Sequence, residues 1–158
     1  NFYTYYAVTT GVPTAMGASG ADRVKNVGQW NPNNETFAGA DIVEAFKKKY
    51  NEDYWLMSSH SAIAMLSKAI KQTGSTDPVK VAFAMEGMTV KSLNGDVEMR
   101  KSDHQALQPI YISTWTKTNS KDVRFDQENT GYGWKTDQKI ETFVAPKPPS
   151  CQMKRAGA

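Results

Sequence analysis

Hydrophobic residues recur at spacings of three and four through the middle of the chain, and this periodicity predicts three helices. The predicted helices cover residues 40–50, 57–71 and 78–86. Such spacing places apolar side chains along one face of a helix. The last helix also has a start signal, because Asp77 is a favoured N-cap residue and Pro78 is tolerated in the first turn.

The helix predicted at 57–71 carries an apolar stripe. Its principal members are Ile63, Leu66 and Ile70. Smaller or more flexible apolar residues lie beside the stripe: Ala62, Met65 and Ala69. A stripe of this kind is typical of a helix that packs through one face.

Segments rich in β-branched and aromatic residues flank the helices and predict strands. Before the helices, residues 2–8 and about 24–30 are of this kind, and a short helix of small residues is expected at 14–21. After the helices, extended segments are expected at 88–90, 97–99, 110–115, 123–125 and 140–144, with 123–125 as a hairpin partner of 110–115. Strands that alternate with amphipathic helices predict an α/β sandwich with a mainly parallel sheet.

Composition and charge narrow the classes of function. A chain of 158 residues with 39% hydrophobic and 22% charged residues is typical of a globular protein. The net charge of +3 is spread along the chain, and the one basic run, Lys47–Lys49, is interpreted as a solvated helix face. A nucleic-acid partner is therefore not expected. The sequence has no apolar run of about 18 residues that would predict a membrane span.

Features that resemble catalytic or metal sites have simpler interpretations. Ser58 and His60 lie too close on a helix to face one another, so a hydrolase is kept only as an alternative. Asp103 and His104 are interpreted as a hydrogen-bonded loop, because two histidines without a paired cysteine make a poor metal site. Cys151 is interpreted as a free thiol in a Pro-rich tail. We therefore expect no enzyme activity, no catalytic residue, no metal and no cofactor.

Several motifs of the chain are more specific together than any one of them alone. The first is NGDVEMRKSDHQ at 94–105, which is followed by LQPIYI at 107–112. The other motifs are GSTDPVKV at 74–81, AMEGM at 84–88, TGYGWK at 130–135 and SCQMKR at 150–155. In this order they resemble the carboxy-terminal part of branched-chain amino-acid (Leu/Ile/Val-type) binding proteins of ABC transporters.

The resemblance implies a type I periplasmic binding protein, in which two α/β lobes joined by three hinge strands close over a solute. This chain would be an incomplete three-layer α/β sandwich that recrosses the hinge near Val90 to Val97. The implied divisions are the end of the second lobe at 1–27, a returning segment of the first lobe at 28–90, closing strands of the second lobe at 91–144, and a flexible tail at 145–158.

The implied function is the capture of branched-chain amino acids or a related small carboxylate, including an aromatic one. The implied partners are this solute, a membrane permease and the missing amino-terminal portion of the same protein. A periplasmic location follows, with a signal peptide expected in the full-length precursor. A ligand-sensing domain of the same fold in a regulator is the alternative.

The family's ligand contacts come from the loop after the opening strand and from the segment that leads into the second helix. Carried over by position, these are Tyr5, Tyr6 and Trp55, with Tyr54 as a neighbour. Amino-acid binders often hold the ligand ammonium with a carboxylate on the first loop, yet residues 5–9 contain no Asp or Glu. A buried cation without an anionic partner is costly, so this absence weakens the assignment of an α-amino acid. Tyrosine hydroxyls and an indole suit an aromatic acid or another small carboxylate equally well.

Overall fold

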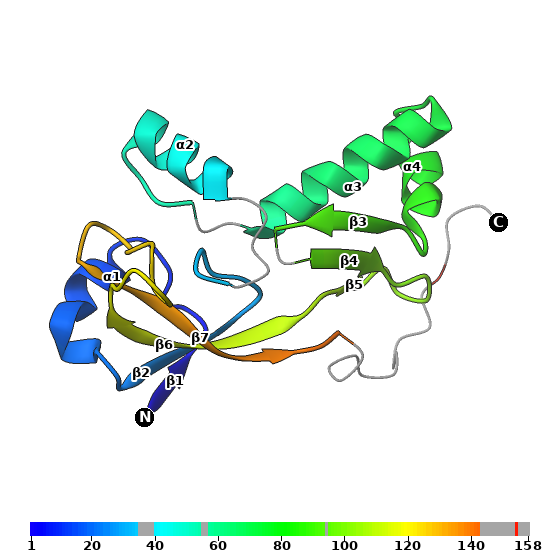
Figure 1. The fold of residues 1–158 in the computed structure, drawn as a ribbon. Coiled ribbons are helices and arrows are strands. Elements are labelled where there is room, and N and C mark those ends of the chain that lie inside the picture. Colours follow the sequence, from blue (N-terminus) through cyan, green and yellow to red (C-terminus); the bar gives the residue numbers. More distant parts are fainter. Residues whose placement is uncertain (35–39, 55–56, 94, 143–153, 155–158) are drawn as a thin grey trace.

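Two β-sheets organise the residues that the computed structural model describes, which are 1–34, 40–54, 57–93, 95–142 and 154 (Figure 1). The larger sheet has the strand order β1–β2–β6–β7, and the smaller has the order β3–β4–β5. The strands are β1 (Phe2–Thr4), β2 (Val24–Gly28), β3 (Thr89–Ser92), β4 (Gly95–Met99), β5 (Ala106–Leu107), β6 (Ile110–Lys117) and β7 (Tyr132–Ile140). The helices are α1 (Val12–Met16), the 3₁₀ helix η1 (Gly17–Gly20), α2 (Ala40–Tyr50), α3 (Met57–Thr73) and α4 (Pro78–Met85).

The core of the larger sheet is built on two tryptophans. Trp115 on β6 and Trp134 on β7 are cross-strand partners, and their ring centroids lie 5.0 Å apart. Both side chains are fully buried, and Ala7 completes the cluster. Strand β6 alternates as a half-buried strand should, with Tyr111, Ser113 and Trp115 turned inward. This packed sheet is the base on which the loops of the candidate site rest.

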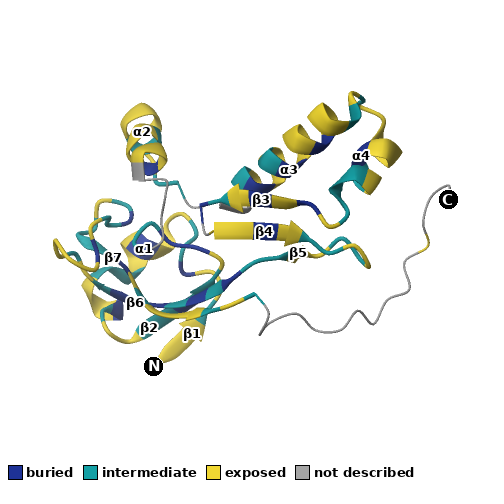
Figure 2. Ribbon diagram, turned by 45° about the vertical axis from the view of Figure 1, so that its right-hand side comes forward, coloured by how far each residue is buried: buried dark blue, intermediate teal, exposed yellow. Residues whose placement is uncertain are grey.

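The smaller sheet packs against α3 and α4. Its core joins Met65 and Ala69 of α3 to Val81 of α4 and to apolar residues of β3 and β4, namely Val90 and Val97. Because Met65 and Ala69 face the sheet, the predicted stripe of α3 points the other way. Figure 2 shows the outer side of α3 as largely exposed. The stripe therefore exists, but it does not pack on this sheet.

The three predicted helices are confirmed, with α2, α3 and α4 within two residues of their predicted bounds. The Asp77 cap is also confirmed, because its carboxylate accepts a hydrogen bond from the backbone N–H of Lys80 at 2.9 Å. Helix α3 ends before Gly74, whose positive φ of 61° suits a helix stop. In the region described, no helix is long and apolar enough to cross a membrane.

The prediction of a mainly parallel sheet is wrong for the described strands. Strand β1 pairs with β2 in parallel, whereas the pairings of β2 with β6, β6 with β7, β3 with β4, and β4 with β5 are antiparallel. The tight connection between β3 and β4 allows only an antiparallel pair, because a parallel pair needs a long crossover. The connection between the parallel strands β1 and β2 contains α1 and η1.

Strand predictions were less accurate than helix predictions. Strand β1 ends at Thr4 rather than at residue 8, and the helix expected at 14–21 is divided into α1 and η1. Residues 123–125 form a loop, and β7 takes their predicted place beside β6. Of the segment predicted at 140–144, only Ile140 lies in a strand, and residues 143–144 fall outside the described residues.

The division of the chain into lobe segments, with a boundary between residues 90 and 91, stays a prediction. Val90 and Val97 are paired across β3 and β4, so both belong to the smaller sheet. The chain returns to the larger sheet only at Ile110, where β6 begins. Apart from Lys154, the predicted tail at 145–158 and its Cys151 lie outside the described residues.

Candidate functional site

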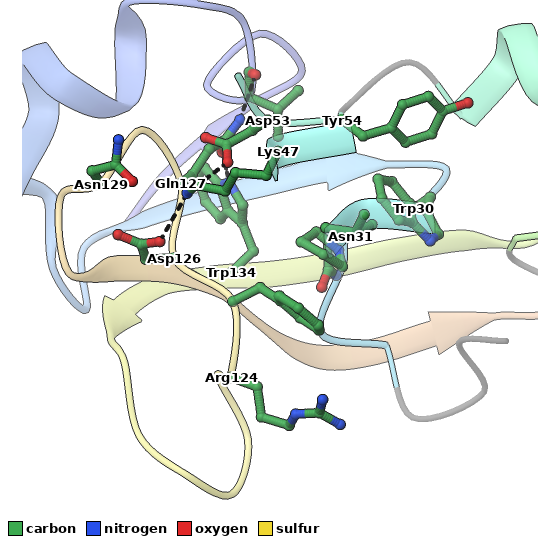
Figure 3. Close-up of a pocket in the computed structure, with 14 residues that line it drawn as sticks. Trp30, Asn31, Lys47, Asp53, Tyr54, Arg124, Asp126, Gln127, Asn129 and Trp134 are labelled. Carbon is green, nitrogen blue, oxygen red and sulfur yellow. Dashed lines mark hydrogen bonds and ion pairs between the residues drawn. The ribbon is translucent and has the colours of Figure 1, made fainter. Parts of the chain in front are cut away.

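Two adjoining pockets form a cleft between α2 and the loops that lie on the larger sheet. The first pocket, shown in Figure 3, has a volume of about 230 Å³, and the second, which is more open, has about 430 Å³. One wall, which we call the α2 wall, consists of residues 43–54. The opposite wall, the loop wall, consists of residues 8–14 and 123–129. Residues of both walls line both pockets, and four line the two together: Lys47, Asp53, Gln127 and Asn129.

Four aromatic residues line the first pocket, together with aliphatic, polar and charged ones. Trp30, Tyr54, Phe125 and Trp134 all contribute to it. The rings of Trp30 and Tyr54 meet edge to face with centroids 5.9 Å apart, and burial raises the pKa of the Tyr54 hydroxyl. Flat rings around a small cavity suit a solute with an apolar or aromatic body.

Gln127 is oriented by hydrogen bonds on both sides of its amide. Its Oε1 accepts from the indole N–H of Trp134 at 2.8 Å, and its Nε2 donates to the carbonyl of Val8 at 2.8 Å. The side chain is buried. Gln127 therefore ties the loop after β1 to β7 and fixes one edge of the aromatic lining.

Lys47 lies where the two walls meet. Its Nζ is 2.9 Å from Oδ1 of Asp53 on the α2 wall and 3.3 Å from Oδ1 of Asp126 on the loop wall. Burial alone would lower the pKa of Lys47, but the hydrogen bonds and charges of the two carboxylates outweigh it and raise that pKa. The interpretation of Lys47–Lys49 as a solvated face is therefore wrong for Lys47, whereas Lys48 and Lys49 are exposed.

Glu128 caps helix α1 from a distant part of the chain. Gly11 is the N-cap residue of α1 and has no side chain to accept a hydrogen bond. The Glu128 carboxylate instead accepts from the backbone N–H of Gly11 at 2.5 Å, and from the N–H and hydroxyl of Thr14 at 2.9 and 2.6 Å. Burial raises the pKa of this carboxyl, but these hydrogen bonds outweigh burial and hold the pKa below its ordinary value. The backbone N–H of Glu128 donates to Asp53, so the cap also links the two walls.

The loop that carries Phe125 is held against β7 by Asn33 and by a glycine. Asn33 binds the backbone of Phe125 and donates to the carbonyl of Trp134 at 3.2 Å. Gly133 is required at this point, because a Cβ there would overlap the carbonyl oxygen of Phe125. The aromatic lining is thus fixed by backbone contacts as well as by packing.

Of the four residues predicted to contact a ligand, one lies in the described cleft. Tyr54 lines the first pocket. Tyr5 and Tyr6 are 69% and 75% exposed and line neither pocket, although their loop contributes Thr10 and Gly11 to the second. Trp55 lies outside the described residues. Solute contact by any of the four remains a prediction.

Sequence reasoning missed the acidic residues of the cleft. Asp53, Asp126 and Glu128 lie at the junction of the walls, so carboxylates reach the cleft even though the loop at 5–9 has none. Asp126 and Glu128 belong to a loop that the sequence pattern predicted to begin as a strand. No local signal marks them, because their partners lie 79 and 117 residues away.

The other chemical candidates have structural partners. His60 Nδ1 lies 3.1 Å from the hydroxyl of Ser92, and the side chain of Ser58 is not described. The interpretation of residues 103–104 as a hydrogen-bonded loop is confirmed, since Arg100 donates twice to Asp103 and His104 lies 3.3 Å from Glu86. Among the residues that the structure describes, no group of three or more His, Cys, Asp or Glu could hold a metal ion.

Known proteins with similar sequences are binding proteins. Residues 2–121 match the sequence model of a family described as periplasmic binding protein. The chain is 29% identical over 137 residues to Leu/Ile/Val-binding protein homolog 4 of Brucella abortus (strain 2308), covering 81% of this chain and 32% of that protein. It is 30% identical over 82 residues to homolog 1 of the same strain, covering 51% of this chain and 22% of that protein. The chain thus spans about a third or less of the length of these curated relatives.

Solved structures resemble the fold. The closed conformation of the leucine-, isoleucine-, valine-, threonine- and alanine-binding protein from Brucella ovis superposes with a TM-score of 0.81 at 25% identity, covering 99% of this chain and 41% of that one. A solute-binding protein of an ABC transporter from Rhodopseudomonas palustris BisB5, in complex with 3,4-dihydroxybenzoic acid, gives a TM-score of 0.67 at 20% identity. That pair covers 81% of this chain and 33% of the other, and at this identity it shows the fold alone.

Proposed function

Because the chain belongs to the periplasmic binding protein family, we propose that it is part of the solute-binding component of an ABC transporter. The fold is that of an incomplete type I periplasmic binding protein. The protein would capture branched-chain amino acids or a related small carboxylate and deliver it to a membrane permease. The observation that carries this proposal is the cleft between the α2 wall and the loop wall.

The lining of the first pocket supports a small solute with an apolar body. About 230 Å³ bounded by Trp30, Tyr54, Phe125 and Trp134 is suited to an aliphatic or aromatic side chain. The aliphatic alternative has the support of the Leu/Ile/Val-binding protein homologues, and the aromatic alternative that of the rings in the lining.

The charged residues at the junction of the walls offer partners for the charged groups of a solute. An α-amino acid carries an ammonium and a carboxylate, and each needs a partner if it is taken out of water. Asp53, which lines both pockets, offers an anionic partner for the ammonium. This arrangement supplies the anionic partner that the loop at 5–9 lacks, and it favours an amino acid over a simple carboxylate.

A complete site requires more of the protein than this chain. Homolog 4 is about three times as long as the region it shares with this chain, and the exposed stripe on α3 supports a further layer of structure packed there. We propose that an amino-terminal portion supplies this layer and the rest of the cleft. The location would be the periplasm, as the family implies.

Isothermal titration calorimetry on the longer protein tests the proposal. The panel is leucine, isoleucine, valine, 4-hydroxybenzoate and 3,4-dihydroxybenzoate, with the wild type and Phe125→Ala compared for each. We expect one class of solute to bind the wild type, and Phe125→Ala to weaken that binding at least tenfold. If a panel solute binds and Phe125→Ala leaves its affinity unchanged, the cleft is not the site. If none binds the folded protein, the proposed solute classes are wrong.

A further inference from the structure

Lys47 is the side chain that joins the two walls of the cleft through an ion pair. It lies on α2, and Figure 3 shows its interactions with Asp53 and Asp126. The Lys47–Asp53 pair lies within the α2 wall, whereas the Lys47–Asp126 pair crosses to the loop wall. A second polar link crosses at the same place, from the backbone N–H of Glu128 to Asp53.

Lys47, Asp53 and Asp126 have different roles at this junction. Asp53 has the least exposed side chain, at 14%, and it fixes the direction of the lysine from its own wall. Asp126 is held on the opposite wall, because its second oxygen accepts from the backbone N–H of Gly131 at 3.0 Å. Both partners of the crossing pair are therefore oriented before they meet, which reduces the entropy lost when the pair forms.

The two walls belong to different parts of the chain. The loop wall rests on the larger sheet, and the chain passes to the α2 wall after β2 and returns between β5 and β6 (Figure 1). Non-covalent contacts must therefore hold the walls together. The apolar contact there joins Val43 and Tyr54 to Phe125, and the ion pair lies beside it.

We propose that Lys47 is a positioning residue of the solute site, which forms with Asp126 an ionic clasp that holds the α2 wall closed against the loop wall. The clasp deepens the proposed function, since a closed cleft is what retains a solute. Superposition of 99% of the chain on a closed conformation supports the assignment of these contacts to the closed state. Closure itself can be measured without any solute, so the clasp can be tested separately.

The experiment measures the distance between the walls by double electron–electron resonance. Spin labels are attached at Glu44→Cys on α2 and Lys135→Cys on β7, both exposed positions, in a Cys151→Ser background. The variants compared are Lys47→Met, Lys47→Arg and Asp126→Asn. Lys48→Met is the matched control, because it removes the same charge from the exposed neighbouring position.

We expect Lys47→Met and Asp126→Asn to broaden the distance distribution and shift it to longer values. Lys47→Arg should restore the short distance, and Lys48→Met should leave it unchanged. Asp126→Asn keeps the shape of the side chain, so circular dichroism should report an intact fold. In the longer protein the same variant should weaken solute binding about fivefold, as expected for a coupling of this size.

A distance distribution that is the same in wild type, Lys47→Met and Asp126→Asn would overturn the clasp. An opening caused equally by Lys48→Met would also overturn it, because loss of charge alone would then be the cause. The proposed function is judged by a different readout. If the walls separate as expected and no solute binds, the clasp stands and the proposed function fails. If a solute binds and the distances never change, the proposed function stands and the clasp fails.

Discussion

Asn33 holds Phe125 by both of its backbone groups. The side-chain Oδ1 of Asn33 accepts a hydrogen bond from the N–H of Phe125, and its Nδ2 donates to the carbonyl of the same residue, each at 2.9 Å. The side chain of Asn33 thus pairs with the backbone of Phe125 as a neighbouring strand would, and it holds the loop in place. The aromatic ring that this loop presents to the cleft depends on that pairing.

Replacing Asn33 by alanine should therefore destabilise the protein and loosen the cleft. The half-buried N–H and carbonyl of Phe125 would lose their partners, which costs about 1–3 kcal/mol for each group left unsatisfied in the folded state. Urea denaturation of the wild type and the variant measures the difference. Gln138→Ala, at an exposed position on β7, is the control and should change the unfolding free energy by less than about 0.5 kcal/mol. Equal stability of wild type and Asn33→Ala would contradict this account of the loop.

Tyr54 and Tyr5 are both predicted ligand contacts, and a comparison of their variants tests whether the solute binds in the cleft. Tyr54 lines the first pocket, whereas Tyr5 is exposed and lines neither. We expect Tyr54→Ala to weaken solute binding at least tenfold, or about 1.4 kcal/mol, and Tyr5→Ala to have little effect. Calorimetry on the longer protein measures both affinities. A loss confined to Tyr5→Ala would move the solute site to the loop after β1 and away from the described pockets.

The helices could be predicted from sequence because their signals are local. The N-cap at Asp77, the stop at Gly74 and the apolar spacing of α2 all lie within a few residues of the structure they specify. Strand β7 was not predicted, because its sequence lacks such a local signal. Gly133 and Trp134 are buried together near one end of it, and the residues that follow are mostly polar, so regular alternation is absent.

The cleft could not be predicted in the same way, because its contacts join residues far apart in the chain. The pairs of Asn33 with Phe125, Lys47 with Asp126 and Gly11 with Glu128 span 92, 79 and 117 residues. Nothing in the sequence around Asp126 or Glu128 distinguishes these acids from solvent-exposed ones. Resemblance to a family indicated which segments approach the solute, and of the residues transferred on that basis, Tyr54 is the one seen to line a pocket.

The cap that Glu128 provides to α1 should depend on pH. The folded-state pKa of this carboxyl is lowered, so its charge adds stability at pH values above the ordinary pKa of 4.5, and this stability is lost as the pH falls through the lower folded value. We expect Glu128→Gln to cost about 1 kcal/mol near pH 7, as for loss of a helix cap. The difference from wild type should shrink as the pH falls below about 4.5.

Urea denaturation of both proteins at several pH values between about 7 and 3 measures this convergence. Glu44→Gln, an exposed carboxylate on α2, is the control and should match the wild type throughout. A gap between Glu128→Gln and wild type that stays constant with pH would mean that the shape of the side chain matters and its charge does not.

Helix α3 has two apolar faces, and one of them lacks a covering among the described residues. Met65 and Ala69 are buried against the smaller sheet, whereas Ile63, Leu66 and Ile70 remain 63%, 40% and 38% exposed. A helix that is apolar on both sides is typical of a position between two layers of structure. We therefore expect the amino-terminal portion of the longer protein to cover the outer face of α3.

Leu66→Lys tests this expectation by comparing two lengths of the same protein. In the 158-residue chain the substitution should change the unfolding free energy by less than about 0.5 kcal/mol, because position 66 is a surface position there. In the longer protein it should cost about 2 kcal/mol or more, since an apolar contact would be lost and a charge would be buried. Ser67→Lys adds the same charge at the next position of the helix, which is exposed but outside the stripe, and should be nearly neutral in both lengths. If Leu66→Lys is equally mild in the longer protein, the outer face of α3 remains exposed there and the proposed third layer is absent.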